Sequence, residues 1–416
     1  MIPDGWERKR LSNFIKKLNA GVSVNSENTA SENSQPAVLK TSCVSNGVFD
    51  PMENKIVIKD DEIARLKESV KKERIIISRM NTPFLVGANA YTKQDYPNLF
   101  LPDRLWQVEP KNKNVCMRWL AFVLGSSKGR FALSSRATGT SGSMKNITKS
   151  DVLSLEIETP PLPEQQLIAE ILSTWDKAIE ATEKLIANSE AQKKALMQQL
   201  LTGKKRLPGF EGEWSATKFD ELFEIVIGGT PSRKNNEYWA SDNQNGFPWI
   251  AISDLKKKYI SETKEAITIL GVNNSNVKLL KAGTIILSFK LSIGKKAILE
   301  TDAYTNEAIC GLVPKKENEI EKHFVFHMLE YMDLEQSVDQ AIKGKTLNKA
   351  KLKKLFLPHP SFEEQKAISI SIEATDKYLE ATKSNLTHLK SEKKALMQQL
   401  LTGKRRVKIE EEDKNA

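Results

Sequence analysis

The sequence predicts an α+β protein, in which two mixed α/β domains are separated by two long helices that form an antiparallel coiled coil. A repeat is the first observation: the segment from Lys193 to Lys204 recurs letter for letter from Lys393 to Lys404, 200 residues later. Second, apolar positions before each copy alternate in steps of four and three, the heptad spacing of paired helices. Third, the remaining segments mix β-rich and helical runs. Together these features indicate a pseudo-twofold internal repeat.

The repeat divides the chain into five parts. We expect a first domain over 1–159, a first helix over 160–206, a second domain over 207–357, a second helix over 358–406 and a charged tail over 407–416. Prolines mark the start of the first repeated segment, and Gly203 and Gly403 mark the ends of the two segments, as at helix boundaries. The helices are nearly copies, whereas the domains share only short similarities, such as Ile75–Ser78 with Ile285–Ser288. A duplicated scaffold that presents two different surfaces is the simplest account.

Each predicted helix is apolar at seven of its ten seam positions. Such an amphipathic helix needs a partner for its apolar face. Each helix could pack only on its own domain, but two similar seams in one chain can satisfy each other. Because the chain returns across a whole domain between them, antiparallel pairing is favoured. The residues expected to pair the helices are Ile168, Leu172, Trp175, Ile179, Ile186, Leu196 and Leu200 in the first, and Ile368, Ile372, Leu379, Leu386, Leu389, Leu396 and Leu400 in the second.

Composition restricts the class of protein. The 416 residues include 63 Lys+Arg against 53 Asp+Glu, and the net charge of +10 favours a polyanionic partner. Charged residues at 28% and hydrophobic residues at 39% are typical of a globular protein and exclude a disordered or fibrous chain. The 3 Cys form no CxxC motif, which argues against a disulfide scaffold or a cysteine zinc site and favours a reducing compartment. No signal peptide or apolar run long enough for a membrane span occurs, so a cytoplasmic protein is expected.

Few residue patterns suggest catalysis. Asp103 and Glu109, followed by Lys111, resemble the two carboxylates and the lysine of a Mg²⁺-dependent DNA nuclease, although the acids are close together in sequence. A local ion pair between Asp103 and Arg104 is the simpler interpretation. The chain has 4 His, too few for much acid–base or metal chemistry. We therefore expect no catalytic, cofactor-binding or metal site in this chain, and the nuclease is the alternative hypothesis.

Basic loops rich in glycine and serine are the candidates for DNA contact. Phosphates are bound by Lys, Arg, Ser, Thr and backbone amides, and bases are read by Arg, Lys, Asn or Gln. A solvated turn explains any one of these residues equally well, but the loops as a group favour DNA. The candidates are Arg79, Asn81, Arg136, Thr140, Ser141, Ser143 and Lys145 in the first domain, and Thr230, Ser232, Arg233, Lys234, Lys290, Lys343, Lys345 and Thr346 in the second.

Several short phrases occur in an order that is more specific than any of them alone. They include the stretches 228–232 (GGTPS), 248–250 (PWI), 305–308 (TNEA) and 101–105 (LPDRL), together with the Leu-Leu-Thr-Gly-Lys exit of both helices. With the duplication, this order resembles the specificity subunit of a type I restriction–modification enzyme, over essentially the whole chain.

The resemblance implies two target-recognition domains, each of which reads one half of a bipartite double-stranded DNA sequence. The two helices would set the spacer between the half-sites and dock two methyltransferase subunits, and restriction subunits would join the complex. It also implies that S-adenosylmethionine, ATP and Mg²⁺ are held by those partner subunits and that this chain holds no cofactor. A scaffold that binds only protein is a third possibility, and it predicts no affinity for DNA.

Overall fold

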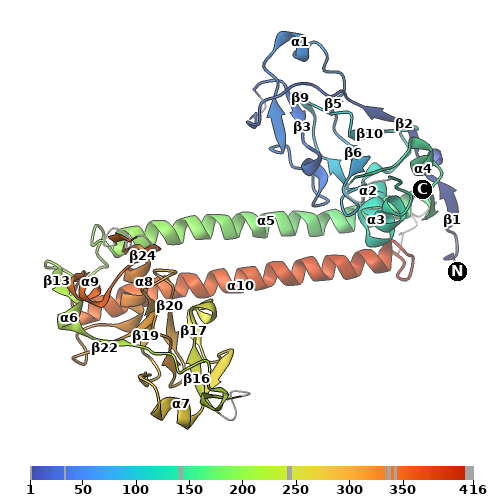
Figure 1. The fold of residues 1–416 in the computed structure, drawn as a ribbon. Coiled ribbons are helices and arrows are strands. Elements are labelled where there is room, and N and C mark those ends of the chain that lie inside the picture. The colour runs from blue at the N-terminus through green and yellow to red at the C-terminus, as the bar shows by residue number, and fades with distance from the viewer. Residues whose placement is uncertain are drawn as a thin grey trace, which may run out of the picture. The chain divides into compact units, whose positions relative to one another are not determined.

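The computed structural model describes residues 2–31, 34–139, 144–240, 246–332, 334, 339–341 and 344–407, with only the backbone described at 339–341 and 344–346. The chain forms two compact units, Met1–Glu183 with Asn385–Ala416, and Lys184–Ser384. Each unit therefore contains one globular domain and part of each long helix, as the colouring of Figure 1 shows. Within the described ranges, no helix combines the length and the apolar character that crossing a membrane requires.

The first domain is built on two four-stranded sheets. One has the order β2-β10-β6-β8 and is antiparallel throughout, and the other has the order β4-β3-β9-β5 with a parallel β3–β9 pair. The strands are β1 (Glu7–Arg10), β2 (Ile15–Ala20), β3 (Ala37–Leu39), β4 (Asn54–Ile56), β5 (Ser69–Val70), β6 (Arg74–Ser78), β7 (Met80–Asn81), β8 (Asn89–Thr92), β9 (Tyr96–Phe100), β10 (Leu105–Pro110), β11 (Lys145–Asn146) and β12 (Glu156–Thr159). The helices are α1 (Asp60–Ile63), α2 (Met117–Gly125), α3 (Ser127–Ser134) and α4 (Lys149–Leu153). Two short ladders, β1–β12 and β7–β11, complete the domain.

The second domain has a five-stranded sheet, β14-β22-β19-β20-β17, and a four-stranded sheet, β15-β18-β16-β21. The strands are β13 (Ser215–Lys218), β14 (Phe223–Ile227), β15 (Trp239–Ala240), β16 (Phe247–Ile250), β17 (Tyr259–Ile260), β18 (Glu265–Ile267), β19 (Ile285–Ser288), β20 (Lys296–Leu299), β21 (Tyr304–Thr305), β22 (Ile309–Pro314), β23 (Asp339–Ala341), β24 (Gly344–Thr346) and β25 (Phe356–His359). The helices are α6 (Phe219–Leu222), α7 (Ile269–Asn273), α8 (Lys322–Tyr331) and α9 (Lys349–Lys354). Ladders β13–β25 and β23–β24 lie outside the two main sheets.

The two domains share a plan that their sequences barely reveal. The similar stretches noticed in the sequence form β6 and β19, each an interior strand with antiparallel neighbours on both sides. Their isoleucines are buried, as suits β-branched residues in a strand covered on both faces. A backbone contact also recurs: the amide of Ile147 donates to the carbonyl of Arg79 (2.9 Å), and the amide of Leu347 donates to the carbonyl of Phe289 (3.1 Å).

The predicted repeat helices are α5 (Leu162–Leu200) and α10 (Phe362–Leu400), each of 39 residues. Both end earlier than the repeated sequence, because Gly203 and Gly403 adopt φ of +67° in the turn that follows. Ion pairs show that the helix segments run antiparallel: in the first unit, Asp176 and Glu183 of α5 pair with Lys393 and Lys390 of α10, respectively. In the second, Lys193 pairs with Asp376 (2.6 Å). All fourteen residues expected to pair the helices are buried or half-buried. The predicted α+β architecture is confirmed.

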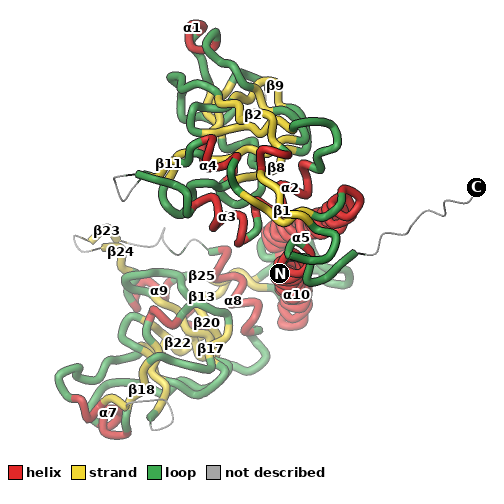
Figure 2. The backbone as a smooth tube through the Cα atoms, turned by 90° about the vertical axis from the view of Figure 1, so that its right-hand side faces the viewer, coloured by secondary structure: helices red, strands yellow, loops and turns green. Residues whose placement is uncertain are grey.

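The ends of the helices also belong to the domain cores. In the first unit, Ile168 and Leu172 of α5 and Leu400 of α10 join one buried cluster with Trp106 and Trp119. The second unit has the equivalent cluster, in which the aromatic residues Phe219 and Phe324 surround Ile368, Ile372 and Leu200. Figure 2 shows α2 and α3 gathered at the end of the first domain that meets α5. The heptad seam therefore serves both purposes that the sequence offered as alternatives, packing on the domain at each helix end as well as on the partner helix.

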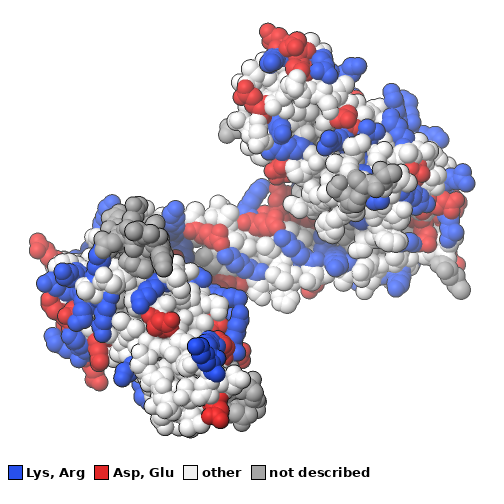
Figure 3. All heavy atoms as spheres, in the orientation of Figure 1, with Lys and Arg blue, Asp and Glu red and all other residues white. Residues whose placement is uncertain are grey.

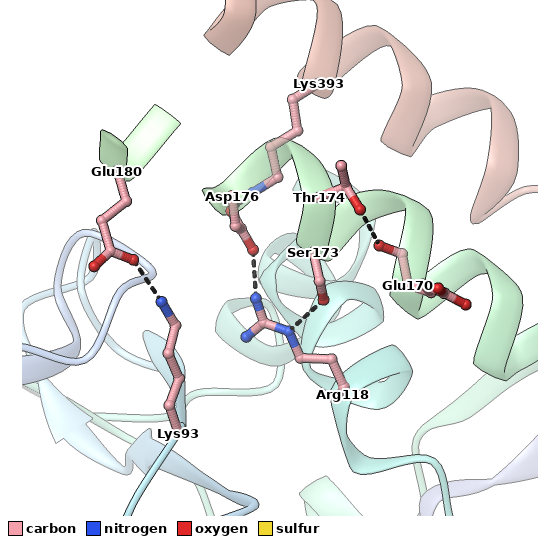
Figure 4. A network of polar contacts seen from close by, with 8 residues as sticks. All are labelled: Lys93, Arg118, Glu170, Ser173, Thr174, Asp176, Glu180 and Lys393. Atoms are coloured by element: carbon pink, nitrogen blue, oxygen red, sulfur yellow. Dashed lines mark hydrogen bonds and ion pairs between the residues drawn. The ribbon is translucent and has the colours of Figure 1, made fainter. Parts of the chain in front are cut away.

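A polar network fixes α2 to the helices in the first unit (Figure 4). Arg118 of α2 donates to Ser173 Oγ (3.1 Å) and pairs with Asp176, both on α5. Lys393 of α10 pairs with the other carboxylate oxygen of Asp176. The Arg118 guanidinium also lies 4.6 Å from the ring centroid of Phe122. These charges are mostly shielded from water, so their hydrogen bonds give a directed attachment of domain to helix.

Candidate nucleic-acid interface

Two of the first-domain candidates lie on the β7–β11 ladder. Asn81 of β7 and Lys145 of β11 are direct cross-strand partners. Asn81 Nδ2 donates to Ser78 Oγ (3.2 Å), and its Oδ1 accepts from the amide of Thr82 (2.9 Å), so the side chain is held by the turn. Lys145 Nζ donates to the carbonyl of Gly139 (3.0 Å). The ladder thus brings together two residues that lie 64 positions apart in the sequence.

Arg79 and Arg136 have different surroundings. Arg79 Nε donates to the carbonyl of Asp103 (2.8 Å), and its guanidinium lies 5.7 Å from the ring centroid of Trp106. It is therefore half-buried and serves the domain's own packing. Arg136 is exposed, and its Nη1 donates to the carbonyl of Ala132 (3.0 Å), which leaves other guanidinium donors available to a phosphate.

In the second domain, the glycine-rich loop after β14 packs against the turn between β21 and β22. The amide of Gly228 donates to the carbonyl of Ile309 (3.1 Å), and the amide of Gly229 donates to the carbonyl of Thr305 (2.8 Å). Thr230 Oγ1 donates to a carboxylate oxygen of Glu307. A side chain at Gly228 would overlap the Thr305 and Asn306 carbonyls. Two of the short sequence phrases are therefore the two sides of one backbone contact, and this contact explains their glycines.

Arg233 is held in a cage of aromatic and acidic side chains. Its guanidinium lies 3.7 Å from the ring centroid of Trp239 and 5.0 Å from that of Trp249, and it forms a bidentate pair with Glu265. The hydrogen bonds from Arg233 lower the pKa of Glu265, and the same bonds raise the pKa of Arg233. Trp249 Nε1 donates to the carbonyl of Gly229 (2.9 Å), which joins this cage to the glycine-rich loop. The contacts of Arg233 therefore hold the glycine-rich loop that also carries the exposed candidates Ser232 and Lys234.

The structure describes the side chains of some remaining candidates, only the backbone of others, and nothing of a third group. Ser232 and Lys234 are exposed beside the Arg233 cage, and Lys290 is half-buried with its ammonium 5.3 Å from the ring centroid of Phe289. Lys345 and Thr346 lie on β24, described by its backbone only. Four of the candidates lie outside the described residues: Thr140, Ser141, Ser143 and Lys343. Figure 3 shows basic side chains interspersed with acidic ones on the visible face of both domains.

Asp103 and Glu109, the two carboxylates of the nuclease hypothesis, have different hydrogen-bond partners. Ser23 Oγ donates to Asp103 (2.5 Å), whereas Glu109 on β10 accepts from Lys16 Nζ (2.9 Å). The hydrogen bond from Lys16 lowers the pKa of Glu109. Lys111 Nζ donates instead to the carbonyl of Ser12 (3.3 Å). The expected local ion pair between Asp103 and its neighbour is also wrong, because the serine is the partner of that carboxylate.

Two exposed apolar side chains in equivalent turns were not among the sequence candidates. In each domain a turn leaves the interior strand and closes on a glycine with positive φ, at Gly87 and Gly294. The Gly87 amide donates to the carbonyl of Ser78 (2.7 Å), and the Gly294 amide donates to that of Ser288 (3.0 Å). Within these turns Phe84 is 87% exposed and Leu291 is 85% exposed. The Val/Ile-Gly pair that recurs at Val86–Gly87 and Ile293–Gly294 was the signal available in the sequence.

Comparisons with known proteins agree with this organisation. The model of the type I restriction modification DNA specificity domain matches twice, at residues 3–190 and 211–390. The chain is 24% identical over 431 residues to the type I restriction enzyme MjaVIII specificity subunit of Methanocaldococcus jannaschii, covering 98% of this chain and 94% of that protein.

Solved structures show the same fold. The HsdS subunit from Thermoanaerobacter tengcongensis has 18% identity and a TM-score of 0.52, with 97% of this chain and 98% of that chain covered. The S subunit of the type I restriction-modification system from M. genitalium has 16% identity and a TM-score of 0.59, with 96% of both chains covered. The two matches to the family model cover both halves of the chain. A DNA specificity subunit therefore replaces the Mg²⁺-dependent nuclease as the interpretation of this chain. The chain therefore belongs to the type I restriction modification DNA specificity family and is a specificity subunit, not an enzyme.

Proposed function

We propose that each domain of this DNA specificity subunit reads one half of a bipartite double-stranded DNA target. The supporting observation is that the domains share a backbone plan but differ in the side chains placed on it. Where the first domain has Met80 and Asn81 after its interior strand, the second has Lys290 and Leu291. Because bases are read by side chains on a fixed frame, a shared frame with different side chains reads different sequences.

The helices, in this proposal, set the spacer and dock two methyltransferase subunits. Each unit has a groove between its domain and its helix segments, of about 980 Å³ in the first and about 730 Å³ in the second. Eight positions that line one groove also line the other after a shift of 200 residues. They are Asp176, Ile179, Glu183, Lys390, Lys393, Lys394, Met397 and Gln398 in the first groove, and Asp376, Leu379, Lys383, Glu190, Lys193, Lys194, Met197 and Gln198 in the second. Two such similar surfaces fit two copies of one partner.

The chemistry is then assigned to the partners. Methyltransferase subunits would bind S-adenosylmethionine, and restriction subunits would use ATP and Mg²⁺. The specificity subunit contributes the choice of DNA sequence and the geometry of assembly. Since its substrate is the cell's own DNA and entering DNA, we propose that it acts in the cytoplasm.

Exchange of one domain should change one half of the methylated motif. Residues 1–159 are replaced by the same part of another family member, and the hybrid is co-expressed with its methyltransferase. The hybrid should retain a tryptophan at position 6, because Trp6 Nε1 donates to the buried Glu164 of α5 (3.1 Å). Mapping methylated adenines across the host genome should show one new half-site, with the other half-site and the spacer unchanged.

The reciprocal exchange of residues 207–357 is the matched control, and it should change only the other half-site. An unchanged motif in both hybrids would contradict the assignment of one half-site to each domain. A chain that binds methyltransferase but no DNA would instead support a protein-only scaffold.

Lengthening both helices by one heptad should lengthen the spacer and leave the half-sites unchanged. Seven residues are inserted after Ile186 and after Leu386, which keeps the ion pairs within each unit in register. Each helix becomes ~10 Å longer at 1.5 Å per residue. At ~3.4 Å per base pair, the methylated motif should gain about three unspecified base pairs.

A single insertion in α5 alone is the control for the helix experiment. It shifts Lys193 and Glu190 relative to their partners on α10, so it should reduce stability without producing a defined new spacer. A changed half-site in the doubly extended protein would argue against the ruler role of the helices.

A further inference from the structure

The two long helices differ in charge at two positions where they meet. In the 200-residue correspondence, Glu183 of α5 matches Lys383 of α10, and Glu190 matches Lys390. In the first unit Glu183 pairs with Lys390 (2.7 Å), and in the second Glu190 pairs with Lys383 (2.6 Å). At these contacts α5 therefore supplies both carboxylates and α10 supplies both ammonium groups.

Two further sets of ion pairs between the helix segments lack this asymmetry. Asp176 with Lys393 in the first unit repeats as Asp376 with Lys193 in the second, so each helix supplies one acid and one base. The pairs of Glu164 with Arg406 and of Glu364 with Arg206 repeat in the same way just beyond the helix ends. These symmetric contacts would form equally well between α5 and α10, between two copies of α5, or between two copies of α10.

Like helices would oppose like charges at the two asymmetric positions. Two copies of α5 in the observed antiparallel register would set Glu183 against Glu190 twice, and two copies of α10 would set Lys383 against Lys390 twice. The apolar seams cannot discriminate in this way, because they are similar and end in the same twelve residues. Opposed like charges destabilise a helix pair and select partners in paired helices.

We infer that Glu183, Glu190, Lys383 and Lys390 select the pairing of α5 with α10 and disfavour assembly of two chains through like helices. All four side chains are about half exposed, with relative side-chain exposures of 49–54%. Each pair is therefore individually weak. Two contacts that change from attraction to repulsion should together shift the pairing equilibrium by about ten-fold, which is ~1.4 kcal/mol. The inference concerns chain assembly and is independent of the proposed DNA target.

Two full-length charge variants test it. The acidic variant carries Lys383→Glu and Lys390→Glu, and the basic variant carries Glu183→Lys and Glu190→Lys. Every helix pair within either variant then has like charges at both positions, whereas any helix of one variant is complementary to any helix of the other. The two are co-expressed with different affinity tags, and two-chain complexes are counted by native mass spectrometry in 50 mM NaCl.

The ratio of mixed complexes, of one acidic and one basic chain, to complexes of two identical variants should be about ten times the ratio expected for random mixing. In 1 M NaCl the excess should fall toward one, because the side chains are exposed and screened. A control with Lys177→Glu and Lys377→Glu changes the net charge of α5 and α10 at exposed positions and should show no such preference. Statistical mixing of the acidic and basic variants would overturn the inference.

The fourfold variant covers the case in which the double variants fold poorly. Glu183→Lys, Glu190→Lys, Lys383→Glu and Lys390→Glu together exchange the charges and restore both attractive contacts. Its thermal midpoint and assembly state should match those of the unaltered chain, even where each double variant is destabilised. A fourfold variant no more stable than the doubles would contradict selection by these four charges.

Discussion

Replacing His327 by leucine should change the free energy of unfolding, relative to wild type, by ~3 kcal/mol more in the stabilising direction at pH 4.5 than at pH 7.5. His327 lies on α8 and is 1% exposed, and neither ring nitrogen has a hydrogen-bond partner among the described residues. The pKa of His327 is lowered to about 3, chiefly by burial and in addition by the positive charges of Lys258 and Lys193, against a smaller opposing effect of Glu373. The protonated imidazolium is therefore strongly disfavoured in the folded state.

The sign of the effect follows from where each state binds the proton. The unfolded chain protonates this histidine near pH 6.5, whereas the folded chain does so only near pH 3. Acid therefore favours unfolding: the stability that neutral His327 permits is complete above pH 6.5 and is lost progressively as the pH falls toward 3. Leucine carries no such cost.

Urea unfolding at pH 7.5 and 4.5 measures this difference. Met328→Leu, a change at the next buried position on the same helix, should preserve the wild-type loss of stability in acid. If the His327→Leu protein lost as much stability between the two pH values as wild type does, another group would be the source of the acid sensitivity.

The second large effect is expected at Gly228, where alanine should cost about 3 kcal/mol or more. An added Cβ would overlap the carbonyl oxygens of Thr305 and Asn306. Those oxygens belong to backbone that is itself held, since the Gly229 amide donates to the Thr305 carbonyl and the Asn306 amide donates to the Ile250 carbonyl. No flexible side chain can move aside, so the glycine-rich loop must shift away from the turn.

Differential scanning calorimetry of Gly228→Ala should show a destabilised second domain. Gly125→Ala is the matched addition of one methyl group, because its Cβ would lie 3.8 Å from Asn89 Oδ1, an ordinary contact. That control should leave the unfolding temperature close to wild type. Equal thermal midpoints for the two variants would show that the loop contact is looser than the backbone indicates.

The sequence predicted the helices more fully than the domains, for a physical reason. A heptad pattern is local, and the exact recurrence of Lys193 to Lys204 fixed its position in both copies. Sheet order is not local: β3 pairs in parallel with β9, and β16 pairs in parallel with β21, across long intervening segments. No short-range pattern specifies which strands meet at such distances.

The candidate interface shows the same limit. Basic residues in glycine-rich loops were visible in the sequence. The contacts of Arg233 with Trp239 and with Glu265, which is 32 positions away, were not. Likewise, the sequence shows that Glu183 is acidic and Lys390 is basic. That the two side chains pair follows only from the antiparallel register of the helices in the structure. Which loop side chains contact bases stays a prediction.

The division of the first unit between the two ends of the chain has a consequence for biosynthesis. Leu400 closes the core around Trp106, and Arg406 pairs with Glu164, which is 1% exposed, through two hydrogen bonds of 2.7 and 2.8 Å. The ribosome makes these residues after the whole second domain, so the first domain waits for them before its core is closed and the buried carboxylate of Glu164 has its charged partner. A premature stop before Leu400 would therefore damage the first domain, although that domain is translated long before the stop.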